Sequence, residues 1–228
     1  MDKSRTEMLL GKTKTQKLAR FKILVVGLGG VGGITSEMLV RTGIENLTIV
    51  DYDIISSSNI NRQVIALSNN IGKSKVQELK NRLLSINPDC NIQGIDEKLT
   101  EANIPEIVNL NFDYVIDAID DVKNKTNLIV YCKAHDINII SALGAGKRTC
   151  NPSYEITDIY KTQNDGLAKV MRKNLKERGV KSHKVCYSMQ NRVETTELGS
   201  VVWHPTACAC VIVSEVINNL TKEWIWKL

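Results

Sequence analysis

The chain has 228 residues, of which 43% are hydrophobic and 24% are charged, and its formal net charge is +5. This composition is typical of a globular domain with a substantial core, and the charge excess is too small to indicate a nucleic-acid partner by itself. The most apolar late stretch, 201–213, is shorter than the roughly 20 residues that a membrane helix needs. We therefore expect no membrane contact.

Six cysteines are present, and no two of them have the CxxC spacing of a zinc knuckle. The N-terminal segment, 1–20, is polar and basic without an apolar core, so it does not resemble a secretory signal. Together these features predict reduced thiols and a cytoplasmic location.

Apolar runs alternate with amphipathic segments along the first two thirds of the chain. Continuous apolar runs predict buried parallel strands, and the segments between them predict crossover helices. In chain order, the patterns predict a helical arm at 4–19, strands at 22–27, 47–51, 90–95, 114–117 and 137–141, and helices at 34–42, 74–86, 104–109 and 123–135. The fold class predicted is a Rossmann-like, doubly wound α/β fold with a mainly parallel sheet.

The pattern changes after Gly146. A half-exposed strand is expected at 153–158, another strand at 184–188, and a strand leading into a packed helix at 199–220. We divide the chain into an N-terminal arm at 1–20, a main α/β domain at 21–150, and a small region at 151–228 that packs on the same core.

A glycine-rich loop follows the first predicted strand. Gly27, Gly29, Gly30 and Gly32 lie between this strand and a helix, where glycines permit a tight turn and let backbone N–H groups approach phosphates. Asp51 ends the second predicted strand, in register to bind ribose hydroxyls. The sequence therefore predicts a nucleotide site, and this motif alone does not separate NAD from ATP.

Charged residues beyond the second strand favour ATP. Arg62 and Lys75 suit a triphosphate whose α-phosphate is attacked, and Asp120, after the fourth strand, suits a magnesium ion that bridges phosphates. The alternatives are that Arg62 and Lys75 are solvated surface charges and that Asp120 caps a helix. An NAD(P)-dependent oxidoreductase would leave all three residues unexplained.

Five short motifs carry a family resemblance: GxGGxG at 27–32, DxD at 51–53, SNxNRQ at 58–63, GxxK at 72–75 and DAxD at 117–120. This set resembles the ubiquitin-activating-type, ThiF-like adenylating superfamily across 20–145. The resemblance implies an ATP-dependent enzyme that adenylates a carboxylate. It also implies cofactor-binding roles for the motif residues: Asp51 on the ribose, Asp53 beside it in DxD, Asn59, Arg62 and Lys75 on the phosphates, and Asp120 on magnesium.

Further segments indicate a branch of this superfamily. The chain lacks the paired CxxC motifs usual in sulfur-carrier activators, and the stretches 4–12, 144–146, 156–162 and 167–179 resemble the tRNA threonylcarbamoyladenosine dehydratase branch. That resemblance implies that ATP activates the threonyl carboxylate of a modified adenosine in tRNA, and that loss of water then closes a ring. The alternative is adenylation of the C-terminus of a ubiquitin-like sulfur carrier.

The same resemblance implies ATP binding and adenylation at 21–150, and substrate or tRNA binding and dimerisation at 151–228. It also implies partners and additional ligands. It implies a homodimer in which Arg5 reaches the ATP of the other subunit; the alternative is that Arg5 is a charge on a disordered tail. A sulfur-relay-type accessory protein and a bound monovalent cation are further expectations from the branch.

Basic residues are concentrated at 161–184. Clustered lysines and arginines favour a tRNA backbone, and the residues assigned to it are Lys161, Lys169, Arg172, Lys173 and Lys176. The alternative is a solvated amphipathic helix whose apolar residues pack inward, namely Leu167, Val170, Met171 and Leu175.

Three of the cysteines and the three tryptophans allow further structural predictions. Cys186 lies in a predicted strand, which favours a buried structural thiol over a catalytic one. Cys208 and Cys210 fall in an apolar run and are expected in the core. Trp203, Trp224 and Trp226 are expected to make packing or dimer contacts rather than to stack on bases.

Overall fold

The computed structural model describes residues 1–108, 111–197 and 199–222. Its centre is a seven-stranded sheet in the order β3-β2-β1-β4-β5-β7-β6, in which every neighbouring pair is parallel except β6 with β7. The strands are β1 (Lys22–Val26), β2 (Asn46–Asp51), β3 (Asn91–Asp96), β4 (Tyr114–Asp117), β5 (Ile139–Ala142), β6 (Glu155–Asp158) and β7 (Lys184–Tyr187). The predicted doubly wound, mainly parallel fold is confirmed.

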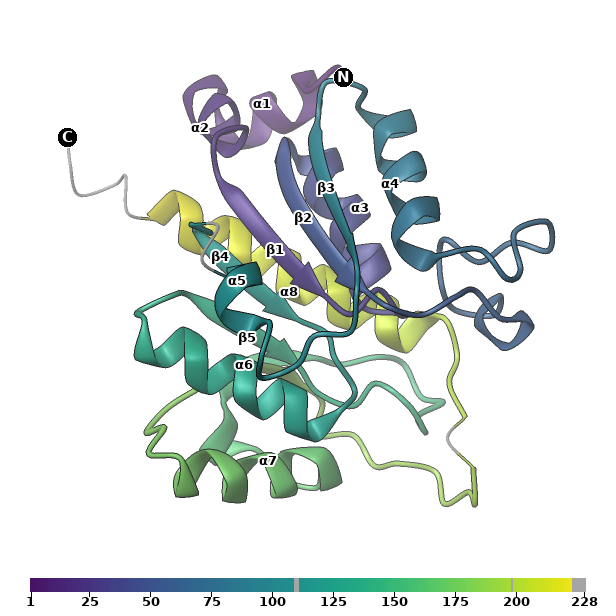
Figure 1. Cartoon of the computed structure of the whole chain (residues 1–228), viewed down its shortest axis with the longest axis vertical. Coiled ribbons are helices and arrows are strands. Elements are labelled where there is room, and N and C mark those ends of the chain that lie inside the picture. Colours follow the sequence, from purple (N-terminus) through teal and green to yellow (C-terminus); the bar gives the residue numbers. More distant parts are fainter. Residues whose placement is uncertain (109–110, 198, 223–228) are drawn as a thin grey trace.

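The helices cover both faces of this sheet, as Figure 1 shows. They are α1 (Ser4–Leu10), α2 (Lys12–Leu18), α3 (Gly32–Thr42), α4 (Lys75–Ile86), α5 (Ile104–Val108), α6 (Val122–Ala134), α7 (Gly166–Glu177) and α8 (Trp203–Lys222). Helices α3, α4 and α8 pack on one face, and α5, α6 and α7 pack on the other.

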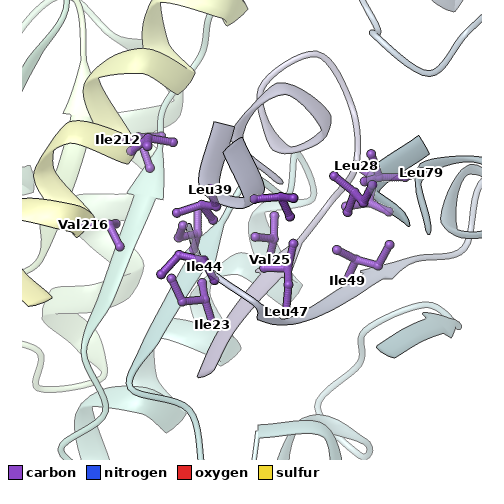
Figure 2. Close-up of a cluster of buried hydrophobic side chains, with 14 of the residues drawn as sticks. Ile23, Val25, Leu28, Leu39, Ile44, Leu47, Ile49, Leu79, Ile212 and Val216 are labelled. Atoms are coloured by element: carbon purple, nitrogen blue, oxygen red, sulfur yellow. The ribbon is translucent and has the colours of Figure 1, made fainter. Parts of the chain in front are cut away.

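Alternate residues of each central strand enter different cores, as the two-residue period of a strand requires. Ile23 and Val25 of β1 lie in the first core with Leu39 of α3 and Ile212 of α8 (Figure 2). Leu24 belongs to the second core, on the opposite face. Burial on both faces explains why β1 reads as a continuous apolar run in the sequence.

The order of the strands reverses between β1 and β4. From β1 the chain winds outward through β2 and β3, and it then returns to β4 and winds the other way through β5. In open parallel sheets this switch point leaves a crevice at the carboxyl ends of the strands, and ligands bind there. The fold alone therefore places a binding site beside the ends of β1 and β4.

Several local predictions need correction. The N-terminal arm is two helices, because Gly11 at φ +86° adopts a left-handed conformation that separates α1 from α2. The strand expected at the start of 199–220 is absent, since residues 199–202 form no strand. Val170 and Cys210 are exposed rather than packed inward. The predictions for Trp224 and Trp226 lie outside the described residues.

Within the described residues, no helix is long and apolar enough to cross a membrane.

Candidate functional site

A cavity of about 570 Å³ lies at the carboxyl ends of the parallel strands, at the predicted switch point. It brings together all the predicted nucleotide-binding residues except Gly32: Gly27, Gly29, Gly30, Asp51, Asp53, Asn59, Arg62, Lys75 and Asp120. These residues come from five different segments of the sequence, so the fold assembles one site from motifs that are distant in the chain.

The glycine loop is packed too tightly for side chains at two positions. A Cβ on Gly27, whose φ is +86°, would lie 2.7 Å from the carbonyl oxygen of Ala118. A Cβ on Gly32, the first residue of α3, would lie 1.8 Å from the carbonyl oxygen of Gly27. Gly29 and Gly30 line the cavity, as Gly27 also does. The loop therefore presents bare backbone to a ligand at the N-terminus of α3, where anions are favoured.

Two alanine substitutions separate packing from binding in this loop. We expect Gly32→Ala to destabilise the fold by several kcal/mol, on the order of an overpacked core site, because its new Cβ meets backbone that cannot give way. Gly29→Ala should leave the thermal unfolding temperature nearly unchanged, since the nearest atom to its Cβ is Gln63 Nε2 at 3.9 Å. It should instead weaken nucleotide binding. Calorimetry and thermal melts of both variants check this, and equal destabilisation by both would contradict it.

Asp51 fastens the glycine loop to the end of β2. Its Oδ2 accepts a hydrogen bond from Leu28 N at 2.6 Å, and its Oδ1 accepts from Tyr52 N at 2.7 Å and Asp53 N at 2.9 Å. The residue is buried and lines the cavity. Because a carboxylate has about four lone-pair positions, Asp51 can still accept ribose hydroxyls.

Lys75 and Arg62 supply positive charge to the cavity wall. Lys75 opens α4, its side chain is only 6% exposed, and its Nζ lies 2.7 Å from Asp53 Oδ2. Arg62 Nη1 donates to the carbonyl of Ser58 at 2.7 Å and to Asn61 Oδ1 at 2.9 Å. Burial of Lys75 contradicts its alternative interpretation as a solvated charge, and both residues keep further N–H donors for a ligand.

Asn59 has a local structural task as well. Its buried side chain accepts a hydrogen bond from Ser56 N at 3.1 Å within a capping box, which shapes the turn that carries Arg62.

Asp120 is exposed at the cavity edge. The cap of α6 is its neighbour Asp121, whose carboxylate accepts from Asn124 N at 2.7 Å, so the interpretation of Asp120 as a helix cap is wrong. Asp120 has no hydrogen bond or ion pair within the described part of the chain. One free carboxylate facing a phosphate site suits Mg²⁺, which takes few protein ligands and keeps water and phosphate oxygens. No larger cluster of metal-binding side chains occurs among the described residues.

Sequence reasoning missed several residues of the cavity. Gln63 lies within the SNxNRQ motif, and its buried Oε1 has no partner among the described residues. Lys98 follows β3 and lies 5.2 Å from the ring centroid of Tyr52. Arg192 comes from the segment between β7 and α8. The motif could have pointed to Gln63, but no sequence signal marks Arg192.

Other predicted residues lie away from the cavity. Arg5 is exposed on α1, whose arm contacts Glu45 and Asn87, just before β2 and β3. Helix α1, which carries Arg5, therefore lies at the amino-terminal edge of the sheet, opposite the cavity (Figure 1).

The basic residues lie on and beside α7. Lys161, Lys169, Lys173 and Lys176 are exposed, whereas Arg172 Nη1 donates to the carbonyl of Thr162 at 2.9 Å. Met171 and Leu175 are buried, so the helix is amphipathic as expected.

Cys186 does not line the cavity. It is fully buried on β7 with its Sγ 3.5 Å from Cys208 Sγ. The hydrogen bond from Cys208, together with burial, raises the pKa of the Cys186 thiol far above its ordinary value. A protonated, inaccessible thiol favours the structural role.

A glycine loop, a buried acid at the end of β2 and two cations around a cavity at the switch point of a doubly wound sheet define a nucleotide-binding α/β protein. The profile of the ThiF family matches residues 3–224, and the chain belongs to this family.

Similar proteins include two tRNA threonylcarbamoyladenosine dehydratases and a molybdopterin-synthase adenylyltransferase. The chain is 43% identical over 161 residues to the tRNA threonylcarbamoyladenosine dehydratase of Haemophilus influenzae, an alignment that covers 71% of this chain and 62% of the relative. It is 37% identical over 178 residues to the enzyme of the same name from Bacillus subtilis, covering 78% of this chain and 70% of the relative. The molybdopterin-synthase adenylyltransferase of H. influenzae is 39% identical over 126 residues, which is 55% of this chain and 51% of that protein.

Solved structures agree along nearly the whole chain. The crystal structure of Escherichia coli tRNA N6-threonylcarbamoyladenosine dehydratase in complex with ATP matches with a TM-score of 0.94 and 31% identity, covering 99% of this chain and 96% of that chain. The complex of the same enzyme with AMP matches with a TM-score of 0.92 and covers 96% and 94%.

Proposed function

We propose that this protein uses ATP to adenylate the threonyl carboxylate of threonylcarbamoyladenosine in tRNA and so drives loss of water from that nucleoside. The observation that carries the proposal is the cavity, where the glycine loop, Asp51, Arg62, Lys75 and Asp120 meet. The likeness to the E. coli dehydratase, solved with both ATP and AMP, supports it along the whole fold.

In this proposal the order of the strands determines where the ribose and the phosphates of the nucleotide lie. The ribose lies on Asp51 at the end of β2, and the phosphates lie over the glycine loop after β1, between Arg62 and Lys75. Lys75 has three N–H donors, of which Asp53 uses one. The two cations neutralise charge that builds on the phosphates as pyrophosphate leaves.

The chemistry needs no protein nucleophile. A carboxylate oxygen of the substrate bonds to the α-phosphorus, and the bond from that phosphorus to the pyrophosphate oxygen breaks. A nitrogen or oxygen of the same side chain then attacks the acyl carbon, and AMP leaves. Because the attacking atom is tethered, its effective concentration is high. The buried thiol of Cys186 is consistent with this route.

Magnesium belongs to this proposal through Asp120. The exposed carboxylate of Asp120 would hold the ion, which when bound would draw charge from the phosphate oxygens.

Adenylation of a sulfur-carrier protein is the alternative. It is less well supported, because the molybdopterin-synthase adenylyltransferase aligns over only 55% of the chain, compared with 71% and 78% for the two dehydratases. Nucleoside mass spectrometry of tRNA from cells with and without this protein separates the two functions. Loss of the dehydrated nucleoside supports the proposal, and an unchanged nucleoside profile contradicts it.

The exposed lysines of α7 are proposed to contact the tRNA backbone. Lys169, Lys173 and Lys176 recur at helical spacing on the face opposite buried Met171 and Leu175. We expect the triple change to glutamate to weaken tRNA binding and to flatten its salt dependence by about 0.9 in log–log slope for each phosphate that is no longer neutralised. ATP binding should be unaffected, because these side chains do not line the cavity.

A matched control applies the same change of net charge at Lys12, Arg20 and Lys22, on the other side of the molecule. Filter binding at several salt concentrations measures both triple variants. If both lose affinity equally, the effect comes from net charge and α7 is not a tRNA surface.

The homodimer and the role of Arg5 are also proposals. Arg5 lies at the edge of the sheet opposite its own cavity, so it can act on a nucleotide only in a partner subunit. We expect mixtures of Arg5→Ala and Lys75→Ala subunits to recover activity, because one site of each mixed dimer regains both residues. Turnover assays and sedimentation of the mixture measure this. A monomeric protein, or a mixture as inactive as its components, would rule the role out.

A tRNA substrate makes the cytoplasm the proposed location.

A further inference from the structure

The segment between β7 and α8 contributes Arg192 and Ser200 to the cavity lining and is hydrogen-bonded to the loop after β5. Lys147 N donates to the carbonyl of Gly199 at 2.8 Å, and Val193 N donates to the carbonyl of Lys147 at 2.6 Å. The Lys147 ammonium also donates to the carbonyl of Thr195 at 2.6 Å. Arg192 lies within this segment, and its guanidinium lines the cavity.

The guanidinium of Arg192 is held by an ion pair with Asp165, but one of its N–H groups has no partner among the described residues. Its Nη2 donates to Asp165 Oδ2 at 2.8 Å, and its side chain is 30% exposed. Its Nε is buried and has no partner among the described residues. A Cβ on Gly144 would lie 2.4 Å from Nη2, so the absence of a side chain at Gly144 lets the guanidinium occupy this position against the backbone.

Asp165 cannot neutralise all the positive charge around it. The same Oδ2 lies 3.8 Å from the guanidinium of Arg148, which is fully buried and also donates to the carbonyls of Gly144 and Ser188. One carboxylate therefore faces two guanidinium groups, while Asp165 Oδ1 accepts from Ala168 N to cap α7. The surplus positive charge lies at the partly exposed member of the pair, Arg192, and it points to an anionic ligand in the cavity.

The strand order places this charge relative to the nucleotide. Asp51 follows β2, the glycine loop follows β1, and Gly144, beside Arg192, follows β5, two strands beyond β1. Neighbouring strands lie about 4.8 Å apart, so Arg192 lies roughly two such steps from the phosphate loop. It is on the side opposite the ribose. In the proposed function the base and ribose occupy the other side, which leaves the side of Arg192 for a second substrate.

We propose that Arg192 binds the carboxylate that becomes adenylated. This inference rests on the proposed function and names the group that holds the substrate's acid. The guanidinium orients the carboxylate so that one oxygen bonds to the α-phosphorus as the bond from phosphorus to pyrophosphate breaks. Asp165 and Gly144 keep the guanidinium in place.

The test compares wild-type protein with Arg192→Gln, and it measures how tightly each of them binds two forms of the substrate. The ligands are an anticodon stem-loop with threonylcarbamoyladenosine and the same stem-loop with its threonyl carboxylate as a methyl ester. Dissociation constants are measured with an ATP analogue present whose bridge between the α- and β-phosphorus cannot be cleaved, so that no adenylate forms. Wild-type protein should prefer the acid by about tenfold or more, the range of a hydrogen bond to a charged group. Arg192→Gln should bring the two constants within about twofold of each other, because the charged hydrogen bond is then absent in both cases.

Lys147→Gln is the matched control. It removes a cation that fastens the same segment but does not line the cavity, so it should keep the wild-type preference for the acid. Should Arg192→Gln fail to fold, Arg192→Lys serves instead, because a single ammonium cannot bond Asp165 and the ligand with the geometry of a guanidinium. In Arg192→Lys the preference for the acid over the ester should fall at least about threefold. This corresponds to losing less than the free energy of one charged hydrogen bond.

The outcomes separate this inference from the proposed function. Wild-type protein that does not distinguish acid from ester, or does not bind the stem-loop, overturns both. Wild-type preference that survives in Arg192→Gln or Arg192→Lys overturns the inference alone. Equal weakening of acid and ester in Arg192→Gln, with the ratio kept, also overturns it, and would show that Arg192 contacts RNA phosphate or supports the fold.

Discussion

Replacing Asp120 with asparagine is expected to lower turnover by about 100-fold or more, the scale seen when one preorganised electrostatic group is removed from an active site. The fold should be unaffected, because Asp120 is exposed and the α6 cap is supplied by Asp121. ATP binding without metal should also persist, since Arg62 and Lys75 remain.

The measurement is steady-state turnover over a range of magnesium concentrations, with a thermal melt of each variant. Asp113→Asn provides the matched control. It makes the same chemical change at the opposite edge of the sheet, where the side chain accepts a hydrogen bond from Lys22 N. Unchanged turnover in Asp120→Asn, or an equal loss in Asp113→Asn, would remove Asp120 from the site.

Replacing Lys125 with methionine is expected to destabilise the protein by about 3–5 kcal/mol, the cost of leaving a buried charge without its partner. Lys125 Nζ lies 2.9 Å from Asp117 Oδ2 at the end of β4, and both side chains are fully buried. Ser141 Oγ donates to the same carboxylate at 2.5 Å and lies 2.8 Å from His183 Nε2. Burial, with nearby lysines, lowers the pKa of His183 to about 3, so its neutral imidazole cannot replace the missing charge.

Urea unfolding measures the change in stability. Lys123→Met, on the exposed face of the same helix, should change stability by no more than about 0.5 kcal/mol. Adding Asp117→Asn to Lys125→Met should recover part of the stability, because the orphaned charge is then removed. A loss in Lys125→Met no larger than that in Lys123→Met would show that the pair does not hold the end of β4.

The predictable part of this structure follows from strands that are parallel and buried on both faces. A continuous apolar run such as that of β1 predicts a strand even though apolar and polar residues do not alternate in it. The loops that follow the parallel strands all lie at the same edge of the sheet. Asp51, Arg62 and Lys75 could therefore be assigned to one site from three separate motifs. It is the β/α arrangement that brings these motifs together.

The missed features depend on tertiary packing. Arg192 belongs to an irregular segment whose position is set by hydrogen bonds to the loop after β5, and no periodicity records such contacts. The apolar residues Val201 and Val202 suggested a strand, but they have no strand partner in the described sheet and lead directly into α8. Asp120 and Asp121 are adjacent acids, and only the geometry shows which of them caps the helix.

Conversion of the nucleoside by purified protein tests the central claim most directly. The protein is incubated with ATP, magnesium and tRNA that carries threonylcarbamoyladenosine, and in parallel with the same tRNA transcribed without modification. We predict a nucleoside lighter by one water, together with AMP and pyrophosphate, from the modified tRNA only. An unchanged nucleoside in the modified tRNA, with AMP formed only when a ubiquitin-like sulfur carrier is added, would contradict the claim.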